Sequence, residues 1–321
     1  MMHSSTPHVW FARLRHLAAW WCACALMLGH ALCVAEDLRM LVVLSDNTPV
    51  HHDFAVSLKE KLADSAQIRV LQYAEYFSRE QVPVDLIVSV GNRASEIVAD
   101  KALVPILATM LPKSKYAELR LAHPGQHEMS AIYLDQPWRR QLDLIRAALP
   151  NKRGIGVLYS ADEAKHLGID ALERAVADRK GMLIRRPVAL SASLFDDLEQ
   201  VLEQSEVLLA VPDSEIYNGG TVRNILLSSY RHHVPLIGLS QSYVNAGALC
   251  AVFSTPEQLA DQVAGMIAAY ARTRRLPPPQ YPSVFSVAVN REVARTLGVP
   301  LLDEGTLLRK MAETGVGDDD L

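Results

Sequence analysis

Short apolar runs alternate with helix-length amphipathic segments along almost the whole chain from Arg39 onward. In the first half the runs are "RMLVVLS", "QIRVLQY", "VDLIVSVG", "VPILATML" and "SAIYL". Several are apolar throughout, as strands must be when helices cover both faces of a parallel sheet. The segments between them, such as 50–65 and 92–101, are long enough to be crossover helices. The alternation therefore predicts a parallel sheet with helices on both faces.

A second series of strands and helices follows a break at Pro150 and Asn151. Its strand-length runs are "GIGVLYS", "MLIRRPVA", "EVLLAVPD", "VPLIGLS" and "ALCAVFS". Between them, Ile169, Leu172 and Val176 recur at helical spacing, as residues on the buried side of a helix do. We therefore predict an α/β fold in which two doubly wound parallel-sheet lobes follow one another.

The two halves also share one internal plan. In each, an apolar strand ends in a polar break, a helix follows, and a Val-Pro pair opens the next strand. The two stretches are "VDLIVSVGNRASEIVADKALVPILATML" and "EVLLAVPDSEIYNGGTVRNILLSSYRHHVPLIGLS". Open parallel sheets bind ligands at the carboxyl ends of their strands. Both polar breaks are therefore predicted to carry binding residues.

The end of the chain is predicted to cross back between the lobes. A helix begins with a capping box from Thr255 to Gln258. After it, "LPPPQYP" predicts a stiff extended linker outside any core, and "SVFSVAVN" predicts one more strand. The predicted boundaries are 36–134 plus 253–281 for lobe 1 and 135–252 plus 282–321 for lobe 2.

The amino-terminal segment is interpreted as a secretory signal. Arg13 and Arg15 precede an apolar run, and Cys33 and Ala35 supply the small residues before a cleavage site. The run approaches the ~20 residues that span a bilayer, so an uncleaved anchor is the alternative. We expect residues 1–35 to be removed and the mature protein to be periplasmic.

Charge and cysteine content exclude two further classes of protein. The formal charge is -4, and removing residues 1–35 takes away two arginines and no acid, which leaves -6. An acidic protein of this kind lacks the basic surface that binds nucleic acid, so no nucleic-acid partner is expected. The same cleavage leaves Cys250 as the only cysteine, in an apolar stretch, so we expect neither an internal disulfide nor a reactive thiol.

Five stretches, in order along the chain, resemble a known family. They are "VDLIVSVGNRASE", "LDLIRAALPNKRGIGVLYSADE", "EVLLAVPDSEI", "VPLIGLSQSYVNAGALCAVFSTPEQLADQVAGMI" and "VAVNREVARTLGVPL". On these, residues 37–301 resemble the ABC-transporter substrate-binding family whose better-known members take up tryptophan, tyrosine and related ligands. The resemblance implies a periplasmic-binding-protein type I fold. In that fold two lobes are joined by a three-stranded hinge, and a small ligand is closed between them.

The sequence departs from the family pattern in the first lobe. Only "SDNTPVHHDF" lies between the first strand and its helix. The segment "LPKSKYAELRLAHPGQHE" stands where the family usually carries an Asp-Pro pair and a glycine-rich loop. Both departures fall on loops that contact ligand in the family, so the identity of the ligand and the dependence on a transporter stay open.

In the second lobe, the candidate ligand residues are Asp213, Tyr217, Asn218 and Ser160. Asp213 directly follows a strand, where its carboxylate could pair with a ligand amine or accept a hydroxyl proton. The family's matching strand also ends in an aspartate near the ligand. The alternative is that Asp213 only caps a helix or forms a turn, as such residues commonly do, and that Gly219 and Gly220 form a simple turn.

In the first lobe, the candidates are Asn92, Arg93, Ser45 and Asp46. The resemblance places Asn92 where the family has a small hydroxyl residue that commonly bonds the ligand's carboxylate, and Arg93 could supply charge. Ser45 and Asp46 end the first strand. The alternative for Asn92 is a helix cap.

Motifs for catalysis or metal binding are missing from the sequence. Adjacent histidines, such as His51 with His52 and His232 with His233, point in different directions and do not converge on one ion. "GLSQS" lacks the second glycine of a nucleophile elbow, and no G-x-G-x-x-G follows a strand. We therefore expect no enzyme activity, no cofactor and no metal.

The predicted function is a periplasmic solute-binding protein of an ABC-type uptake system. It would capture a small polar or amphiphilic ligand, such as an amino acid, by hinge closure, and would present the closed form to a permease. We expect it to act as a monomer. The alternative is an envelope sensor or accessory protein that keeps the fold and signals to another membrane protein.

Overall fold

In a computed structural model of the protein, residues 38–78, 83–189 and 194–315 are described. The predicted signal at residues 1–35 lies outside this part of the chain. The described helices include none that is both long and apolar enough to span a membrane.

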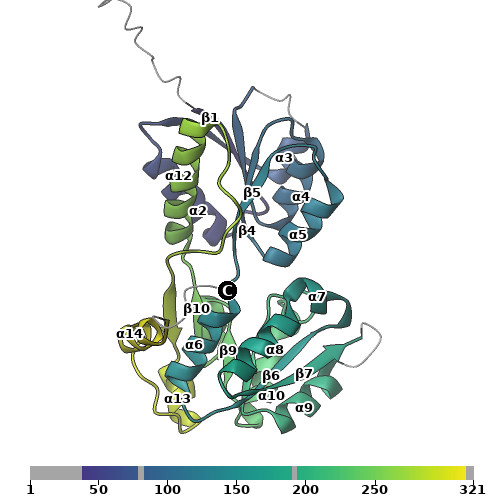
Figure 1. Cartoon of the computed structure of the whole chain (residues 1–321), viewed down its shortest axis with the longest axis vertical. Helices are drawn as coiled ribbons and strands as arrows, with labels where there is room; N and C mark the ends of the chain where they lie inside the picture. The colour runs from purple at the N-terminus through teal and green to yellow at the C-terminus, as the bar shows by residue number, and fades with distance from the viewer. Residues whose placement is uncertain (1–37, 79–82, 190–193, 316–321) are drawn as a thin grey trace, which may run out of the picture. The chain divides into compact units, whose positions relative to one another are not determined.

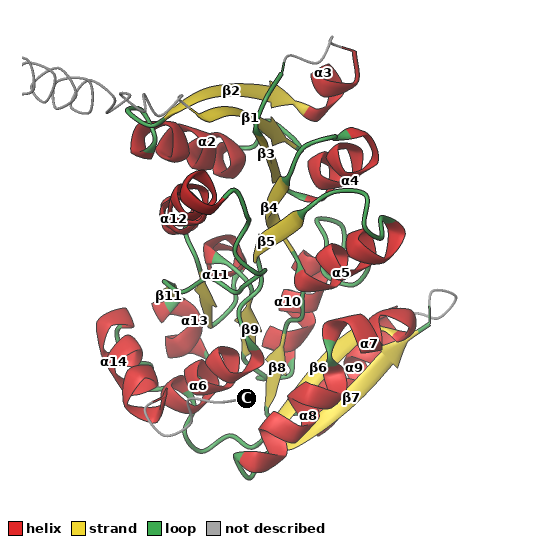
Figure 2. Cartoon of the chain, turned by 45° about the horizontal axis from the view of Figure 1, so that its top comes forward, coloured by secondary structure: helices red, strands yellow, loops and turns green. Residues whose placement is uncertain are grey.

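The first lobe is built on a five-stranded parallel sheet, in the order β2-β1-β3-β4-β5. Its strands are β1 (Leu38–Leu44), β2 (Ala66–Gln72), β3 (Leu86–Val90), β4 (Ile106–Leu111) and β5 (Met129–Tyr133). Its helices are α2 (Pro49–Lys61), α3 (Tyr73–Ser78), α4 (Asn92–Lys101), α5 (Lys113–Ala122) and α12 (Pro256–Thr273). Helices α2 and α12 cover one face of the sheet and α3 to α5 cover the other (Figure 2). Because both faces are covered, β3, β4 and β5 are buried along their whole length.

The second lobe has a six-stranded sheet in the order β11-β10-β9-β8-β6-β7. Its strands are β6 (Gly154–Ser160), β7 (Met182–Val188), β8 (Val207–Leu209), β9 (Leu236–Gly238), β10 (Cys250–Phe253) and β11 (Ser286–Val289). All neighbours are parallel except β10 and β11, which are antiparallel. Its helical elements are α6 (Trp138–Ala148), η1 (Ala161–Glu163), α7 (Ala164–Leu167), α8 (Ile169–Asp178), α9 (Leu194–Gln204), α10 (Val222–Arg231), α11 (Gln241–Ala246), α13 (Arg291–Thr296) and α14 (Glu304–Gly315). The predicted fold of two doubly wound α/β lobes is confirmed.

Three segments of the chain connect the two sheets (Figure 1). They are residues 134–137, 254–255 and 282–285, and side chains tie them together. The Gln136 amide donates to Ser254 Oγ at 3.0 Å, and Ser254 Oγ donates to the Val284 carbonyl at 2.7 Å. Arg140 donates to the Pro282 carbonyl at 2.8 Å and stacks over Phe285 at 4.1 Å. This is the hinge that the family resemblance implied, and the lobe boundaries given above remain predictions.

The proline-rich linker differs from its prediction. Instead of lying outside any core, it pairs with the edge of the first sheet at Gln280, whose N–H donates to the Ala131 carbonyl at 2.9 Å. The next residue, Tyr281, packs edge-on against Tyr133 with ring centroids 5.1 Å apart. Fixed proline φ angles keep the segment extended, and an extended backbone can add to a sheet edge as readily as it can span a gap. The linker therefore closes the β5 edge of the first lobe.

Candidate functional site

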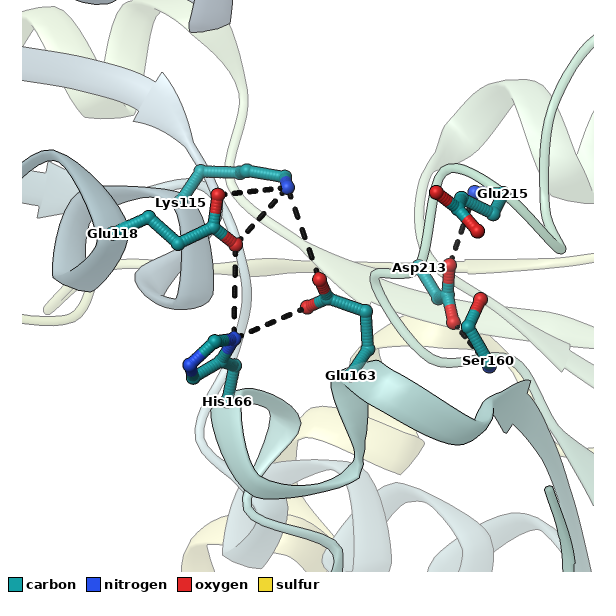
Figure 3. Close-up of polar contacts among 7 residues, drawn as sticks. All are labelled: Lys115, Glu118, Ser160, Glu163, His166, Asp213 and Glu215. Atoms are coloured by element: carbon teal, nitrogen blue, oxygen red, sulfur yellow. Dashed lines mark hydrogen bonds and ion pairs between the residues drawn. The ribbon is translucent and has the colours of Figure 1, made fainter. Parts of the chain in front are cut away.

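Asp213 joins the carboxyl ends of two neighbouring strands in the second lobe. Its Oδ2 accepts the backbone N–H of Ser160, the last residue of β6, at 2.6 Å (Figure 3). Its Oδ1 accepts the N–H of Glu215 at 3.0 Å, which holds the loop after β8. Asp213 is only 4% exposed. Both carboxylate oxygens thus bond the backbone, and each keeps a further lone pair for another donor.

The charge of Asp213 has no positive partner. Among the described residues, the carboxylate forms no ion pair within the 4.0 Å that defines one. Buried carboxylates are normally paired, because removing the charge from water is costly. Asp213 therefore lies at the strand ends as a buried carboxylate whose described partners are two backbone N–H groups.

Ser160 and Tyr217 add two buried hydroxyls to the same edge. Ser160 is 2% exposed, and its Oγ has no hydrogen-bond partner. Tyr217 is buried as well, and burial raises the pKa of its phenol. Its hydroxyl lies near the backbone of Leu158 without a well-formed hydrogen bond. Both side chains therefore have hydrogen-bonding capacity that the protein does not use.

Asn218, in contrast, organises its own turn. Its amide donates to the carbonyls of Ser214 and Glu215, both at 3.1 Å, and its Oδ1 accepts the N–H of Gly220 at 2.9 Å. The side chain is exposed and its polar groups are engaged locally. The structure shows Asn218 forming a turn with its own side chain.

In the first lobe, Ser45 holds the start of α4. Its Oγ accepts the N–H of Ala94 at 2.9 Å, and its own N–H donates to the carbonyl of Val90. Gly91 precedes the helix with φ +83°, and a Cβ there would lie 2.7 Å from Ser45 Oγ. The polar break after β3 needs glycine for both reasons. Ser45 thus serves as a cap contributed by a neighbouring strand.

Asp46 and Arg93 lie at the surface. Asp46 accepts the N–H and hydroxyl of Thr48, at 3.0 and 2.6 Å, and lies 2.7 Å from His51 Nδ1. Slight burial opposes its ionisation, but the Thr48 hydrogen bonds and the His51 contact together hold the pKa of Asp46 below its usual value. Arg93 is exposed on α4. Asp46 is therefore used at the start of α2.

Asn92 differs from its neighbours in the first lobe. Its Oδ1 is buried without a hydrogen-bond partner. Asn92 also lines a cavity of about 280 Å³ between α4 and α5, together with Glu96, Lys115 and Glu118. Asn92 is thus the first-lobe candidate with an unused acceptor, and it opens into a space lined by charged side chains.

A lobe-bridging cluster of four charged side chains continues from this cavity. It consists of Lys115 and Glu118 on α5 and of Glu163 on η1 and His166 on α7 (Figure 3). Lys115 Nζ lies 2.9 Å from Glu118 and 3.9 Å from Glu163. His166 Nδ1 lies 3.8 Å from a carboxylate oxygen of each glutamate. The cluster joins the two lobes beside Asp213.

Two carboxylates of the lobe-bridging cluster lie near a single lysine. Burial raises the pKa of Glu163, and the neighbouring carboxylates Glu118 and Asp213 raise it further, although Lys115 opposes this. Burial alone would lower the pKa of Lys115, but the Glu118 hydrogen bonds and the charge of Glu163 raise it. One lysine is therefore shared among several carboxylates.

Sequence reasoning did not identify this cluster. Lys115 and Glu118 are three residues apart on one helix, and Glu163 and His166 are three residues apart across η1 and α7, so the sequence favours one local pair in each segment. Their convergence depends on the placement of two segments from different lobes. The one available signal was the departure of "LPKSKYAELRLAHPGQHE" from the family pattern, because this segment contains Lys115 and Glu118.

The same residues could be considered as a metal site. Ligand atoms of Glu118, Glu163 and His166 lie within 4.8 Å of one another. Lys115, however, donates to both carboxylate oxygens of Glu118 and supplies the positive charge that a metal would bring. The arrangement is that of an ion-pair network. The thiol of Cys250 is equally unsuited to chemistry, because complete burial raises its pKa to about 12.

A larger cavity, of about 520 Å³, lies elsewhere in the first lobe. It is formed around the beginnings of β1 and β2, with mainly apolar walls that include Leu41, Leu71 and Ile87. Polar side chains do not converge there as they do around Asp213. The strand ends that carry Asp213, Ser160 and Asn92 therefore remain the candidate site.

Comparison with known proteins agrees with the fold. Residues 53–312 match the family model described as ABC transporter substrate binding protein. A conserved domain protein from Vibrio cholerae has 19% identity and a TM-score of 0.62, over 85% of this chain and 98% of that one. An ABC domain from Streptococcus pneumoniae in complex with L-Trp has 17% identity and a TM-score of 0.61, over 84% and 98%.

A third structure is the ligand-free, open form of a substrate binding protein with adhesive properties from Clostridium difficile. It has 13% identity and a TM-score of 0.64, over 84% of this chain and 97% of that one. No curated protein matches the sequence. At these identities the structural likenesses show the fold alone.

Proposed function

Since the chain belongs to the ABC transporter substrate-binding protein family, we propose that it is a periplasmic protein that captures a small ligand between its two lobes. In this proposal the ligand contacts the strand ends of both sheets, and the closed form is presented to a permease. The permease and the periplasmic location are parts of the proposal that the family supports.

One observation carries the proposal: each lobe brings an unsatisfied buried polar group to the ends of its strands. The second lobe offers Ser160 Oγ, beside the buried carboxylate of Asp213, which forms no ion pair among the described residues. The first lobe offers Asn92 Oδ1. Leaving such groups without partners costs free energy, which a ligand that hydrogen-bonds them would recover. Tyr217 and Arg93 remain further candidates, whereas Ser45, Asp46 and Asn218 have local structural roles in the unliganded lobes.

Hinge closure follows from the connections between the sheets. Within the described part of the chain, the segments that cross between the sheets are 134–137, 254–255 and 282–285, so few backbone angles need to change when the lobes rotate. A ligand that contacts both lobes stabilises the closed arrangement relative to the open one. The free energy of these contacts therefore sets both the affinity and the degree of closure.

The lobe-bridging cluster favours a second candidate function. Lys115 and His166 already connect α5 to η1 and α7 through the protein's own side chains. A protein whose lobes hold each other in this way could report a change in the envelope to another membrane protein instead of feeding a permease. This sensor keeps the same fold and the same hinge.

The test combines calorimetry with small-angle X-ray scattering. We expect at least one member of a library of amino acids, amines, peptides, sugars and nucleosides to bind, and the radius of gyration to shrink on binding. Asn92→Ala and the double variant Asn92→Ala/Asp213→Asn should weaken binding by more than about tenfold. A folded protein that binds no member of the library would refute capture of these classes, and binding without contraction would favour the sensor.

A further inference from the structure

The charged side chains around the candidate site are predominantly acidic. Asp213 is buried and has no cationic partner among the described residues. Glu163 lies close enough for the negative charge of Asp213 to raise the pKa of the Glu163 carboxyl. Across the lobe-bridging cluster, Glu118 faces Glu163, and Glu96 lines the adjoining cavity. Lys115 and His166 are the basic groups of the same cluster.

Lys115 is not free to receive an anion. Its ammonium already donates to both carboxylate oxygens of Glu118, at 3.0 and 2.9 Å, and has Glu163 at 3.9 Å. Arg93 is exposed and does not line the cavity that Asn92 and Glu96 share. A ligand carboxylate placed beside Asp213 and Glu163 would therefore meet two carboxylates, and the lysine nearest to them already bonds Glu118.

The unsatisfied buried atoms agree with this charge. Ser160 Oγ, 2% exposed, lies next to the Asp213 carboxylate, to which the Ser160 N–H donates. On the first-lobe side, Asn92 Oδ1 is the candidate-site atom that is buried without a partner. Both can accept hydrogen bonds, as can the remaining lone pairs of Asp213. An ammonium group offers three N–H donors and one positive charge, which is the complement of such a set.

We propose that the ligand is an organic cation without a carboxylate, such as a primary amine, whose ammonium group lies against Asp213 and Glu163. This inference rests on the proposed function, because it concerns the ligand of the same site. The ammonium would be the cationic partner of the Asp213 carboxylate, and would donate a hydrogen bond to Ser160 Oγ. The rest of the ligand would extend toward Asn92 and the cavity beside Lys115.

The experiment compares amines with the amino acids that differ from them only by a carboxylate. The probes are tryptamine against L-tryptophan, tyramine against L-tyrosine and agmatine against L-arginine, titrated by calorimetry at neutral pH and low salt. In at least one pair we expect the amine to bind about tenfold more tightly or better, the difference that one charge-assisted hydrogen bond typically makes. Added salt should weaken amine binding.

Two variants locate the effect. Glu163→Gln removes one negative charge, and the described partners of this carboxylate are the side chains of Lys115 and His166. The variant should therefore fold, and its affinity for the amine should fall about tenfold. Asp213→Asn should lose more if it remains folded. The matched control is Glu203→Gln, the same change at an exposed position of α9, which should leave amine binding unchanged.

The alternatives have distinct outcomes. Tighter binding of the amino acid, with contraction in scattering, would overturn the cation proposal and leave solute capture intact. No binding of any library member by the folded protein would remove the proposed function as well. Mn²⁺ and Zn²⁺ are titrated in parallel. If one of them binds while no amine does, and His166→Ala abolishes this binding, the amine proposal is overturned in favour of a metal at the lobe-bridging cluster.

Discussion

The strand ends of the two lobes carry similar residues but use them differently. In the first lobe, Ser45 accepts a backbone N–H of α4, and Asp46, at the surface, accepts the N–H of Thr48 just before α2. In the second lobe, Ser160 and Asp213 are buried and keep bonding capacity that the protein does not use. The candidate residues of the first edge therefore mainly stabilise its own loops, whereas those of the second edge leave a buried hydroxyl, Ser160 Oγ, without a described partner.

Substituting the aspartate of each edge should give the largest difference in stability between the two lobes. Asp213→Ala should lower the free energy of unfolding by about 3 kcal/mol, because two backbone N–H groups lose a charged acceptor and one of them is buried. Asp46→Ala should cost less than about 1 kcal/mol, because the carboxylate is half exposed and screened by solvent. Denaturant unfolding of both variants measures the two costs. Equal costs would contradict the proposed contrast between the edges.

Glycine substitutions test how closely the strand ends of the first lobe are packed. Gly91→Ala should cost about 2 kcal/mol, because φ is +83° and the new Cβ would lie 2.7 Å from Ser45 Oγ. Gly219→Ala is the matched control in the second lobe, since a Cβ there would meet nothing within 4 Å beyond its chain neighbours. It should change stability by less than about 0.5 kcal/mol. Thermal unfolding of the two variants gives the comparison, and a costly Gly219→Ala would show that the second turn is also closely packed.

The fold was largely predictable from the sequence because its signals are local. Apolar runs of strand length and striped helices each identify an element, and parallel order follows from crossover helices. The proline-rich segment was misplaced because its pairing partner, β5, is distant in sequence. Extended conformation is a property of the segment itself, whereas the edge that it joins is a property of the folded lobe.

The candidate site was predictable only where one strand end determines it. In the sequence, Ser160 ends one apolar run and Asp213 directly follows another, so the rule for parallel sheets places them at the same edge. The lobe-bridging cluster needs Lys115 and Glu163 to meet across two lobes, and no local pattern contains that information. For the same reason, the sequence alone could not show whether Ser45 and Asn218 bond the protein's own backbone or contact a ligand.

Two buried tyrosines give a finer comparison. In the first lobe, the Tyr116 hydroxyl donates to the Met129 carbonyl at 2.9 Å, so Tyr116→Phe should cost about 1 kcal/mol. In the second lobe, the Tyr217 hydroxyl has no such bond, and Tyr217→Phe should leave the free energy of unfolding nearly unchanged. Denaturant titration of both variants, followed by calorimetry with the amine probes, checks this. A large stability cost for Tyr217→Phe would show that its hydroxyl is already satisfied.

The smallest effects concern pH, and the two edges should respond in opposite directions. The pKa of Asp46 is lowered, so Asp46 contributes stability above its unfolded-state pKa, and this is lost as pH falls through the lower folded-state pKa. The pKa of Glu163 is raised, so ionised Glu163 opposes folding at neutral pH and ceases to do so once acid protonates it in both states. Asp46→Asn should therefore be less stable than wild type at neutral pH, and Glu163→Gln more stable, each by less than about 1 kcal/mol because solvent screens both groups. Both differences should disappear toward low pH in denaturant titrations.

A Glu163→Gln variant that is destabilised at neutral pH would mean that the attraction of Glu163 to Lys115 and His166 outweighs the repulsion among the carboxylates. It would remove the electrostatic basis for a cationic ligand.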